Sequence, residues 1–334
     1  MSPAYPFSAI VGQDEMKTAL ILTSVDPAIG GVLVFGDRGT GKSTAVRGLA
    51  ALLPPIRVVE GCPVNSARPE DVPDWAGPVG RRIVRRPTPV VDLPLGATED
   101  RVTGALDIES ALVQGVRRFQ PGLLAQANRG YLYIDEVNLL EDHIVDLLLD
   151  AAASGENVVE REGISVRHPA RFVLVGSGNP EEGELRPQLL DRFGLSVDVT
   201  SPRDIETRIE VIRRRTAFDA DPEGFCRRWR GRDGATRNRI LAGRERLATM
   251  PTPEGFLRDS ASLCLALGAD GLRGELTLVR AARALAAYQD DPAPGRPHLR
   301  RVAAAALRHR LRRDPLDEAG SEARVARAVA EVLG

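Results

Sequence analysis

Short runs of β-branched and other apolar residues alternate with helical patterns through the first 200 residues of the chain. The runs predict strands at residues 32–35, 56–60, 130–134, 171–176 and 196–199. Apolar residues that recur every three or four positions predict helices at residues 13–25, 42–53, 143–154 and 186–193. This alternation predicts an α/β domain with a parallel sheet between layers of helices.

Two long segments interrupt the alternation. Residues 62–129 are rich in proline and too long for a bare loop, so we expect them to carry a small structure of their own. Two prolines exclude a helix and predict an extended segment at residues 83–91, whereas residues 108–116 fit a helix. Residues 157–168 alternate apolar and polar positions around a tight turn, which predicts a β-hairpin.

The chain after residue 200 shows helical patterns with few strand signals. Ser201 can cap the first of these helices, Pro202 fits its first turn, and Asp204 favours its positive N-terminal end. Residues 219–234 are polar and rich in turn formers, which predicts a linker. Further helical patterns lie at residues 238–247, 259–267, 276–288, 300–312 and 321–332.

A chain of 334 residues with 43% apolar residues is long enough for two domains that each bury a core. We expect residues 1–200 to form a nucleotide-binding α/β domain, with insertions near residues 62–129 and 157–168. Residues 201–234 are then a helix and linker, and residues 235–334 an all-α C-terminal domain.

Charge and composition exclude several classes of function. The net charge of −1, with acids and bases interspersed, lacks the electrostatic footprint of a nucleic-acid binder. No run of 18 apolar residues predicts a membrane span, and the N-terminus lacks the pattern of a secretory signal. Three widely spaced cysteines indicate reduced thiols rather than a zinc site. We therefore expect a cytoplasmic protein that binds no nucleic acid.

A complete phosphate-binding loop follows the apolar run at residues 32–35, and an amphipathic helix follows the loop. The glycines let the backbone curl so that successive N–H groups point at the phosphates. The loop holds one of only two lysines among 45 basic residues, and its compact ammonium suits the β- and γ-phosphates of ATP. Its serine supplies a hydroxyl for Mg²⁺. The loop residues are Gly36, Asp37, Arg38, Gly39, Thr40, Gly41, Lys42 and Ser43.

Further residues fit the hydrolysis of ATP. The strand at residues 130–134 ends in Asp135, which suits the metal, and Glu136, which suits activation of the attacking water. Asn179 follows the next strand and is suited to orient that water, although it could instead only start a turn before a proline. Arg192 ends a helix before the last strand, where it could reach the nucleotide of a neighbouring subunit as an arginine finger.

These elements in this order resemble an AAA+ ATPase, with Asn179 at the sensor 1 position and Arg192 at the arginine-finger position. More narrowly, the chain resembles the small ATPase subunits of magnesium chelatase, the enzyme of chlorophyll and bacteriochlorophyll synthesis. The resemblance covers nearly the whole chain and implies sensor 2 at Arg273 and an adenine pocket at Ile10 and Val11. It is carried by residues 7–14, 36–43, 89–96, 99–107, 131–146, 155–161 and 271–277.

The resemblance also implies a fold and a function. The fold is a P-loop αβα sandwich with a five-stranded parallel sheet, followed by a helical C-terminal bundle. The function is that of a motor that binds ATP and Mg²⁺, forms a hexameric ring and drives Mg²⁺ insertion into protoporphyrin IX. Two larger partners are implied: a related AAA+ subunit with an integrin-type domain, and a porphyrin-binding subunit.

Two other functions remain open at this point. A MoxR-type AAA+ chaperone shares both insertions and a helical C-terminal region, and remodels or metallates another protein complex. A DNA-remodelling ring is disfavoured by the neutral charge of the chain, because DNA binding depends on neutralising phosphates.

Overall fold

The computed structural model describes residues 3–37, 39–106, 119–161, 164–179, 185, 187–269, 271–311 and 320–334. Within these residues, five parallel strands form the central sheet in the order β11-β1-β10-β7-β4. Val32 lies opposite both Val175 and Leu195, which sets the register at the centre of the sheet. The predicted α/β class is confirmed. The strands are β1 (Val32–Gly36), β4 (Val90–Leu93), β7 (Tyr131–Ile134), β10 (Val173–Gly178) and β11 (Leu195–Val199).

Strand residues alternate between two apolar layers. Val32 and Val34 belong to a core shared with α1, α2 and the C-terminal helices, whereas Leu33 belongs to a core shared with α6. This alternation is the period-2 pattern of a strand that is buried on both faces. The sequence-based helices of this domain are confirmed as α1 (Asp14–Val25), α2 (Lys42–Leu52), α6 (Asp142–Ser154) and α7 (Pro187–Arg192).

The edge strand differs from the sequence-based prediction. The predicted strand at residues 56–60 exists as β2 (Ile56–Val59), but it pairs antiparallel with β3 (Ile83–Arg86) outside the central sheet. β4, from the proline-rich insertion, takes the fifth place beside β7. Gly130 permits this, because a Cβ at that position would lie 2.3 Å from the carbonyl oxygen of Pro89. The edge position is therefore decided by a close approach between distant segments.

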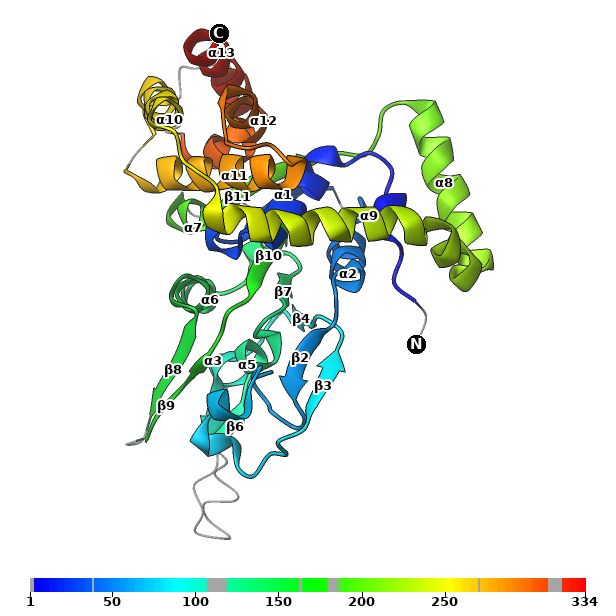
Figure 1. Ribbon diagram of the computed structural model, residues 1–334, viewed down its shortest axis with the longest axis vertical. Coiled ribbons are helices and arrows are strands. Elements are labelled where there is room, and N and C mark those ends of the chain that lie inside the picture. The colour runs from blue at the N-terminus through cyan, green and yellow to red at the C-terminus, as the bar shows by residue number, and fades with distance from the viewer. Residues whose placement is uncertain are drawn as a thin grey trace.

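Both insertions extend from the same end of the sheet (Figure 1). The hairpin is confirmed as β8 (Glu156–Arg161) and β9 (Ile164–Pro169). It packs against the first insertion, where the rings of Trp75 and Phe119 lie 4.8 Å apart beside Val159. The helix predicted at residues 108–116 lies outside the described residues. The other described elements of the first insertion are η3 (Pro69–Asp71), η4 (Asp74–Ala76), α3 (Glu99–Thr103), β5 (Gly104–Leu106), β6 (Phe119–Pro121) and α5 (Leu123–Ala127).

Helices make up the rest of the described chain, as predicted, but the predicted linker is wrong. Residues 222–249 form one continuous helix, α9, which runs from α8 to the C-terminal bundle (Figure 1). Aromatic packing explains the difference, because the guanidinium groups of Arg214 of α8 and Arg232 of α9 each lie 4.7 Å from the ring centroid of Trp229. These tertiary contacts override the weak helix propensity of the glycines. The helices are α8 (Ile205–Ala220), α9 (Pro222–Thr249), α10 (Glu254–Leu267), α11 (Arg273–Gln289), α12 (Arg296–Leu307) and α13 (Ser321–Leu333).

Two details of this region correct the sequence-based boundaries. α8 begins at Ile205, and its cap is Asp204, whose carboxylate accepts a hydrogen bond from the Thr207 backbone N–H at 2.8 Å. Ser201 therefore precedes the helix. The expected domain boundary near residue 235 falls inside α9, so no break in secondary structure marks it.

The short helix η7 (Arg308–Arg310) joins the C-terminal bundle to the α/β domain. Arg308 is buried and forms ion pairs with Glu15 of α1 at 2.8 Å and with Asp198 of β11 at 2.6 Å. The Nε2 of His309 lies 3.1 Å from the carbonyl oxygen of Phe193. A neutral imidazole that donates from Nε2 satisfies this geometry, and its buried Nδ1 has no hydrogen-bond partner among the described residues.

His309 should make the stability of the protein depend on pH. Burial, together with the neighbouring charges of Arg310 and Arg308, lowers the pKa of His309 to about 3. The unfolded chain, with a histidine pKa of about 6.5, therefore binds more protons than the folded chain below pH 6.5. The free energy of unfolding should fall by about 2 kcal/mol from this group between pH 7 and pH 5.

The measurement is urea unfolding of the wild type and of His309→Gln at pH 7 and pH 5. The variant should lose about 2 kcal/mol less between the two pH values than the wild type does. His143→Gln is the control, because the His143 side chain is 58% exposed on α6. Equal pH dependence in the wild type and His309→Gln would rule out this role for His309.

Candidate active site

The phosphate loop joins β1 to α2, as the sequence predicts. A Cβ at Gly36 would lie 1.8 Å from the carbonyl oxygen of Val199, so only glycine allows β1 to end against β11. Gly41 precedes α2 with φ of 85°, a left-handed conformation that glycine adopts without strain. α2 then begins at Lys42, and its N-terminal amides face the loop. Arg38 of the loop lies outside the described residues.

Lys42 lies over the loop that precedes it. Its Nζ donates to the carbonyl oxygen of Gly36 at 2.6 Å and lies 3.3 Å from that of Asp37. The ammonium group is therefore held in the concave side of the loop, with Ser43 next to it on the first turn of α2. This arrangement concentrates positive charge and N–H donors at one point, which favours a bound phosphate.

A cavity of about 410 Å³ brings the predicted catalytic groups together. The carboxyl ends of parallel strands meet at one edge of the sheet, which is why groups from β1, β7 and β10 converge there. The cavity is lined by Gly39, Thr40, Gly41, Lys42, Ser43, Thr44, Tyr133, Asp135, Glu136, Gly178 and Asn179. The phosphate loop, the acidic pair and the buried Asn179 thus share one space.

Two hydroxyl groups orient the carboxylate of Asp135. The Oγ of Ser177 donates to Asp135 Oδ1 at 2.6 Å, and the hydroxyl of Tyr133 lies 3.1 Å from the same oxygen. Burial raises the pKa of Tyr133, so its hydroxyl stays protonated and donates. Sequence reasoning missed both residues. The available signal was their position, because each lies on a strand that ends in a predicted catalytic group.

Glu136 has an unusual backbone conformation. Its φ of 55° and ψ of 56° are left-handed, which costs free energy for a residue with a side chain. The backbone N–H of Glu136 donates to the Oγ of Ser177 at 3.3 Å, so Ser177 contacts both members of the acidic pair. Such strain is concentrated at functional sites, where neighbouring contacts hold it.

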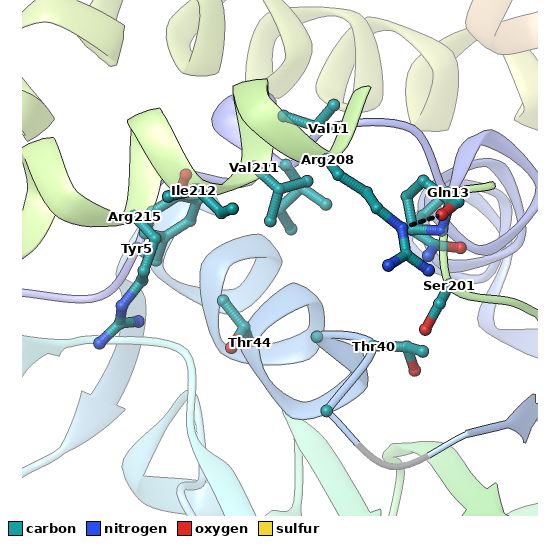
Figure 2. A pocket seen from close by; sticks show the side chains of 14 residues that line it. Tyr5, Val11, Gln13, Thr40, Thr44, Ser201, Arg208, Val211, Ile212 and Arg215 are labelled. Carbon is teal, nitrogen blue, oxygen red and sulfur yellow. Dashed lines mark hydrogen bonds between the residues drawn. The ribbon is translucent and has the colours of Figure 1, made fainter. Parts of the chain in front are cut away.

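A second cavity, of about 490 Å³, adjoins the first and shares part of the phosphate loop with it (Figure 2). Ile10 and Val11 line this cavity, which is where an adenine pocket would place them. Figure 2 shows Val211 and Ile212 of α8 on the opposite side from Thr44 of α2. The lining comprises Tyr5, Ile10, Val11, Gln13, Gly39, Thr40, Gly41, Thr44, Ser201, Pro202, Arg208, Val211, Ile212 and Arg215.

Sequence reasoning missed the contribution of α8 to this cavity. Val211 and Ile212 of α8 line the cavity and are 41% and 65% exposed, which is high for large apolar side chains on a helix. Exposed apolar surface beside a polar rim is typical of a ligand-binding groove. The repeated apolar positions among the charges of α8 were the signal that could have revealed it.

The structure does not bring Arg192 or Arg273 into either cavity. Arg192 ends α7 and forms ion pairs with Asp150 and, at 3.7 Å, with Asp146 of α6. Arg273 begins α11, and its Nη1 lies 3.0 Å from Asp191 Oδ2. An arginine finger that acts in trans serves the nucleotide of a neighbouring subunit, so a position outside the cavity of its own chain is compatible with that prediction for Arg192. The sensor 2 role of Arg273 stays a prediction.

The residues of the first cavity fit a nucleotide with Mg²⁺. Among the described residues there is no group of three or more His, Cys, Asp or Glu side chains that could hold a metal by itself. Mg²⁺ is usually bound by one or two protein oxygens together with substrate phosphates, rather than by an all-protein cage. Ser43 and the oriented Asp135 carboxylate line the cavity beside the phosphate loop and offer that kind of ligand set.

Comparisons with known proteins agree with this geometry. The family model described as magnesium chelatase, subunit ChlI, matches residues 107–185, and the AAA lid domain model matches residues 257–329. The magnesium-chelatase 38 kDa subunit of Cereibacter sphaeroides is 72% identical over 333 residues, which cover 100% of both chains. In the described part of the chain, no helix is both long and apolar enough to cross a membrane.

Two solved structures resemble the fold. One is a chain from the complex between subunits BchI and BchD of magnesium chelatase, based on single-particle cryo-EM. It is 66% identical, with a TM-score of 0.60 over 99% of this chain and 100% of that chain. The other is a putative ATPase from Cytophaga hutchinsonii, 15% identical, with a TM-score of 0.66 over 98% of this chain and 91% of that chain. At that identity, the second similarity concerns the fold alone.

Proposed function

We propose a mechanism for this chain from the premise that it belongs to the magnesium chelatase subunit ChlI family. It is an AAA+ ATPase subunit of a chelatase, and the comparisons do not favour the alternative of a MoxR-type chaperone. In the proposal, it hydrolyses ATP to drive insertion of Mg²⁺ into protoporphyrin IX. The observation that carries the proposal is the 410 Å³ cavity shared by the phosphate loop, Asp135, Glu136 and Asn179.

The two adjoining cavities divide the binding of ATP between them. The N–H groups of the loop, the N-terminus of α2 and Lys42 bind the triphosphate. The adenine lies against Ile10, Val11 and the apolar side chains of α8, where burial of the base removes apolar surface from water. Ser43 and Asp135 would hold Mg²⁺, which when bound neutralises charge on the phosphates.

Hydrolysis then depends on groups at the ends of β7 and β10. Glu136 accepts a proton from the attacking water, and Asn179 orients that water beside the terminal phosphate. Ser177 keeps Asp135 and the backbone of Glu136 in a fixed relation to each other. Among the described residues, no arginine lines this cavity to counter the charge that develops in the transition state, and Arg192 and Arg273 lie outside its lining.

A ring of subunits would complete the site. Arg192 of one subunit would reach the nucleotide of the next, and the family resemblance suggests a hexamer. The solved relative is a complex of BchI with BchD, and we extend that pairing to this chain. The partners in this proposal are a related AAA+ subunit with an integrin-type domain and a large porphyrin-binding subunit, and the compartment is the cytoplasm.

Reconstitution of the chelatase tests the proposed function. The purified chain, both partner subunits, ATP, Mg²⁺ and protoporphyrin IX are mixed, and the fluorescence of magnesium protoporphyrin is recorded. Product should require both ATP and this chain. Lys42→Ala should weaken ATP binding by about 100-fold, because the loop loses its charge-assisted donor, and should abolish product at micromolar ATP.

Lys17→Ala is the matched control, because Lys17 is the other lysine of the chain and pairs with Asp14 on α1. It should leave product formation unchanged. Robust ATPase activity without any magnesium protoporphyrin would argue against the chelatase function. Full product formation with Lys42→Ala would argue against the phosphate site.

A further inference from the structure

One arginine of the C-terminal bundle holds the end of α7. Arg310 is buried, and its Nη2 donates to the carbonyl oxygen of Phe193 at 2.6 Å and to that of Asp191 at 3.1 Å. Its Nη1 donates to the carbonyl oxygen of Gly194 at 3.0 Å. Its Nε lies 3.2 Å from Asp191 Oδ1. The guanidinium fork therefore binds backbone acceptors on both sides of Arg192.

These acceptors belong to the end of a helix, where carbonyl groups lack partners within the helix. Burial lowers the pKa of Arg310 to about 10, with Asp191 opposing the shift, so Arg310 keeps its charge at neutral pH. Its hydrogen bonds to the three carbonyl oxygens are then charge-assisted. One side chain of η7 therefore binds the carbonyl groups of residues 191, 193 and 194, which places Arg310 in direct contact with the backbone on both sides of Arg192.

The carboxylate of Asp191 adds a second connection. One oxygen accepts from Arg310 and the other accepts from Arg273 Nη1 at 3.0 Å. Arg273 begins α11 and Arg310 lies in η7, so two separate segments of the bundle meet at the residue that precedes Arg192. A shift of the bundle relative to the α/β domain changes both contacts together.

We propose that Arg310 and Asp191 position Arg192, so that the C-terminal bundle of one subunit sets ATP hydrolysis in the neighbouring subunit. The inference rests on the proposed finger role of Arg192. In this arrangement Arg310 is a positioning residue that touches no nucleotide. A movement of the bundle would then change the position of Arg192 through the hydrogen bonds of Arg310 to the end of α7.

The chain offers a matched pair of variants. Arg310→Lys keeps a positive charge but loses the planar fork that reaches three carbonyl groups, because an ammonium is a single point of donors. Arg308→Lys is the control, since Arg308 lies two residues away in η7, is equally buried, and binds Glu15 and Asp198 instead of α7. Both variants weaken the docking of the bundle, but only the first removes hydrogen bonds to the end of α7.

The first experiment is a double-mutant cycle on the ATPase rate at saturating ATP. Arg310→Lys should lower kcat by about 10-fold or more, with the KM for ATP changed by less than about twofold. Arg308→Lys should change kcat by less than about twofold. Arg192→Ala combined with Arg310→Lys should be no slower than Arg192→Ala alone, because the positioning residue has nothing left to position.

The second experiment separates effects within a subunit from effects on its neighbour. Arg310→Lys is mixed in equal amounts with Glu136→Gln, which has an inactive site but an intact finger. About a quarter of the sites in random rings then combine an active site with a neighbouring finger, since each is present with a chance of about one half. The ATPase rate that the Arg310→Lys mixture recovers should equal the rate that Arg192→Ala recovers when it is mixed with Glu136→Gln.

Three results would overturn the inference. The first is that the effects of Arg192→Ala and Arg310→Lys on kcat are additive, and the second is that Arg308→Lys lowers kcat as much as Arg310→Lys does. The third is that the Arg310→Lys mixture recovers less ATPase activity than the Arg192→Ala mixture. If Arg192→Ala keeps the wild-type rate, the finger role itself fails. That result is distinguishable from a failure of the Arg310 inference, because it is measured on the Arg192 variant alone. If the Arg192→Ala mixture does not recover activity, the finger does not act across subunits, and the inference that the bundle sets hydrolysis in the neighbouring subunit is overturned.

Discussion

Replacing Glu136 by glutamine should lower the rate of ATP hydrolysis at saturating ATP by about 100-fold or more while leaving ATP affinity within about twofold. The glutamine side chain has nearly the same size and polarity, so the shape of the 410 Å³ cavity and the contact of the backbone N–H with Ser177 stay in place. What is lost is a carboxylate that can accept the proton of the attacking water. The expected state is a subunit that binds ATP and stalls.

The measurement combines a phosphate-release assay with the binding of a fluorescent ATP analogue. Glu141→Gln is the matched control, because Glu141 lies five residues along the chain at the start of α6 and its side chain is 79% exposed. It lies outside the lining of both cavities and should hydrolyse ATP at the wild-type rate. A Glu136→Gln subunit that hydrolyses ATP within about tenfold of the wild-type rate would exclude Glu136 as the principal base.

Replacing Arg192 by alanine should lower kcat by about 10³-fold, the lower end of what arginine fingers contribute to phosphoryl transfer. ATP binding should change little, because Arg192 lies outside both cavities of its own chain and pairs with Asp150 and Asp146 of α6. The rate and the affinity therefore respond differently, as expected for a group that acts only in the transition state.

Asp150→Asn is the control for the loss of that ion pair. Asp150 is 73% exposed, so its pair with Arg192 contributes little to stability. The variant should keep at least the wild-type kcat, because it removes the closer of the two ion pairs that hold Arg192 to α6 and leaves the arginine itself in place. If Asp150→Asn loses as much activity as Arg192→Ala, the ion pair within the subunit is the essential feature and the finger role is wrong.

Much of the site was predictable because its signals are local. The glycines of the phosphate loop are required by backbone conformation, as with Gly41 at φ of 85°. The acidic pair directly follows a strand, and the strand and helix periods are visible in short windows of sequence. Parallel strands that end at one edge then bring Lys42, Asp135 and Asn179 into the same cavity.

Other features depend on contacts between segments far apart in the chain. Ser177 orients Asp135 across 42 residues of sequence, and its position near the end of a strand does not by itself show which carboxylate it contacts. α8 supplies one wall of the second cavity only because the chain after β11 returns beside α2. The continuity of α9 likewise depends on the contact of Trp229 with Arg214 of α8, which outweighs the turn-forming residues that predicted a linker.

The sequence by itself determined the fold class, the phosphate loop and the acidic pair, because each depends on the conformational limits and periodicity of consecutive residues. Only the tertiary structure decided that β4 rather than β2 completes the sheet, and that Arg310 binds the end of α7 across 119 residues. Such long-range choices depend on close packing and on the pairing of buried polar groups, which no short window of residues contains.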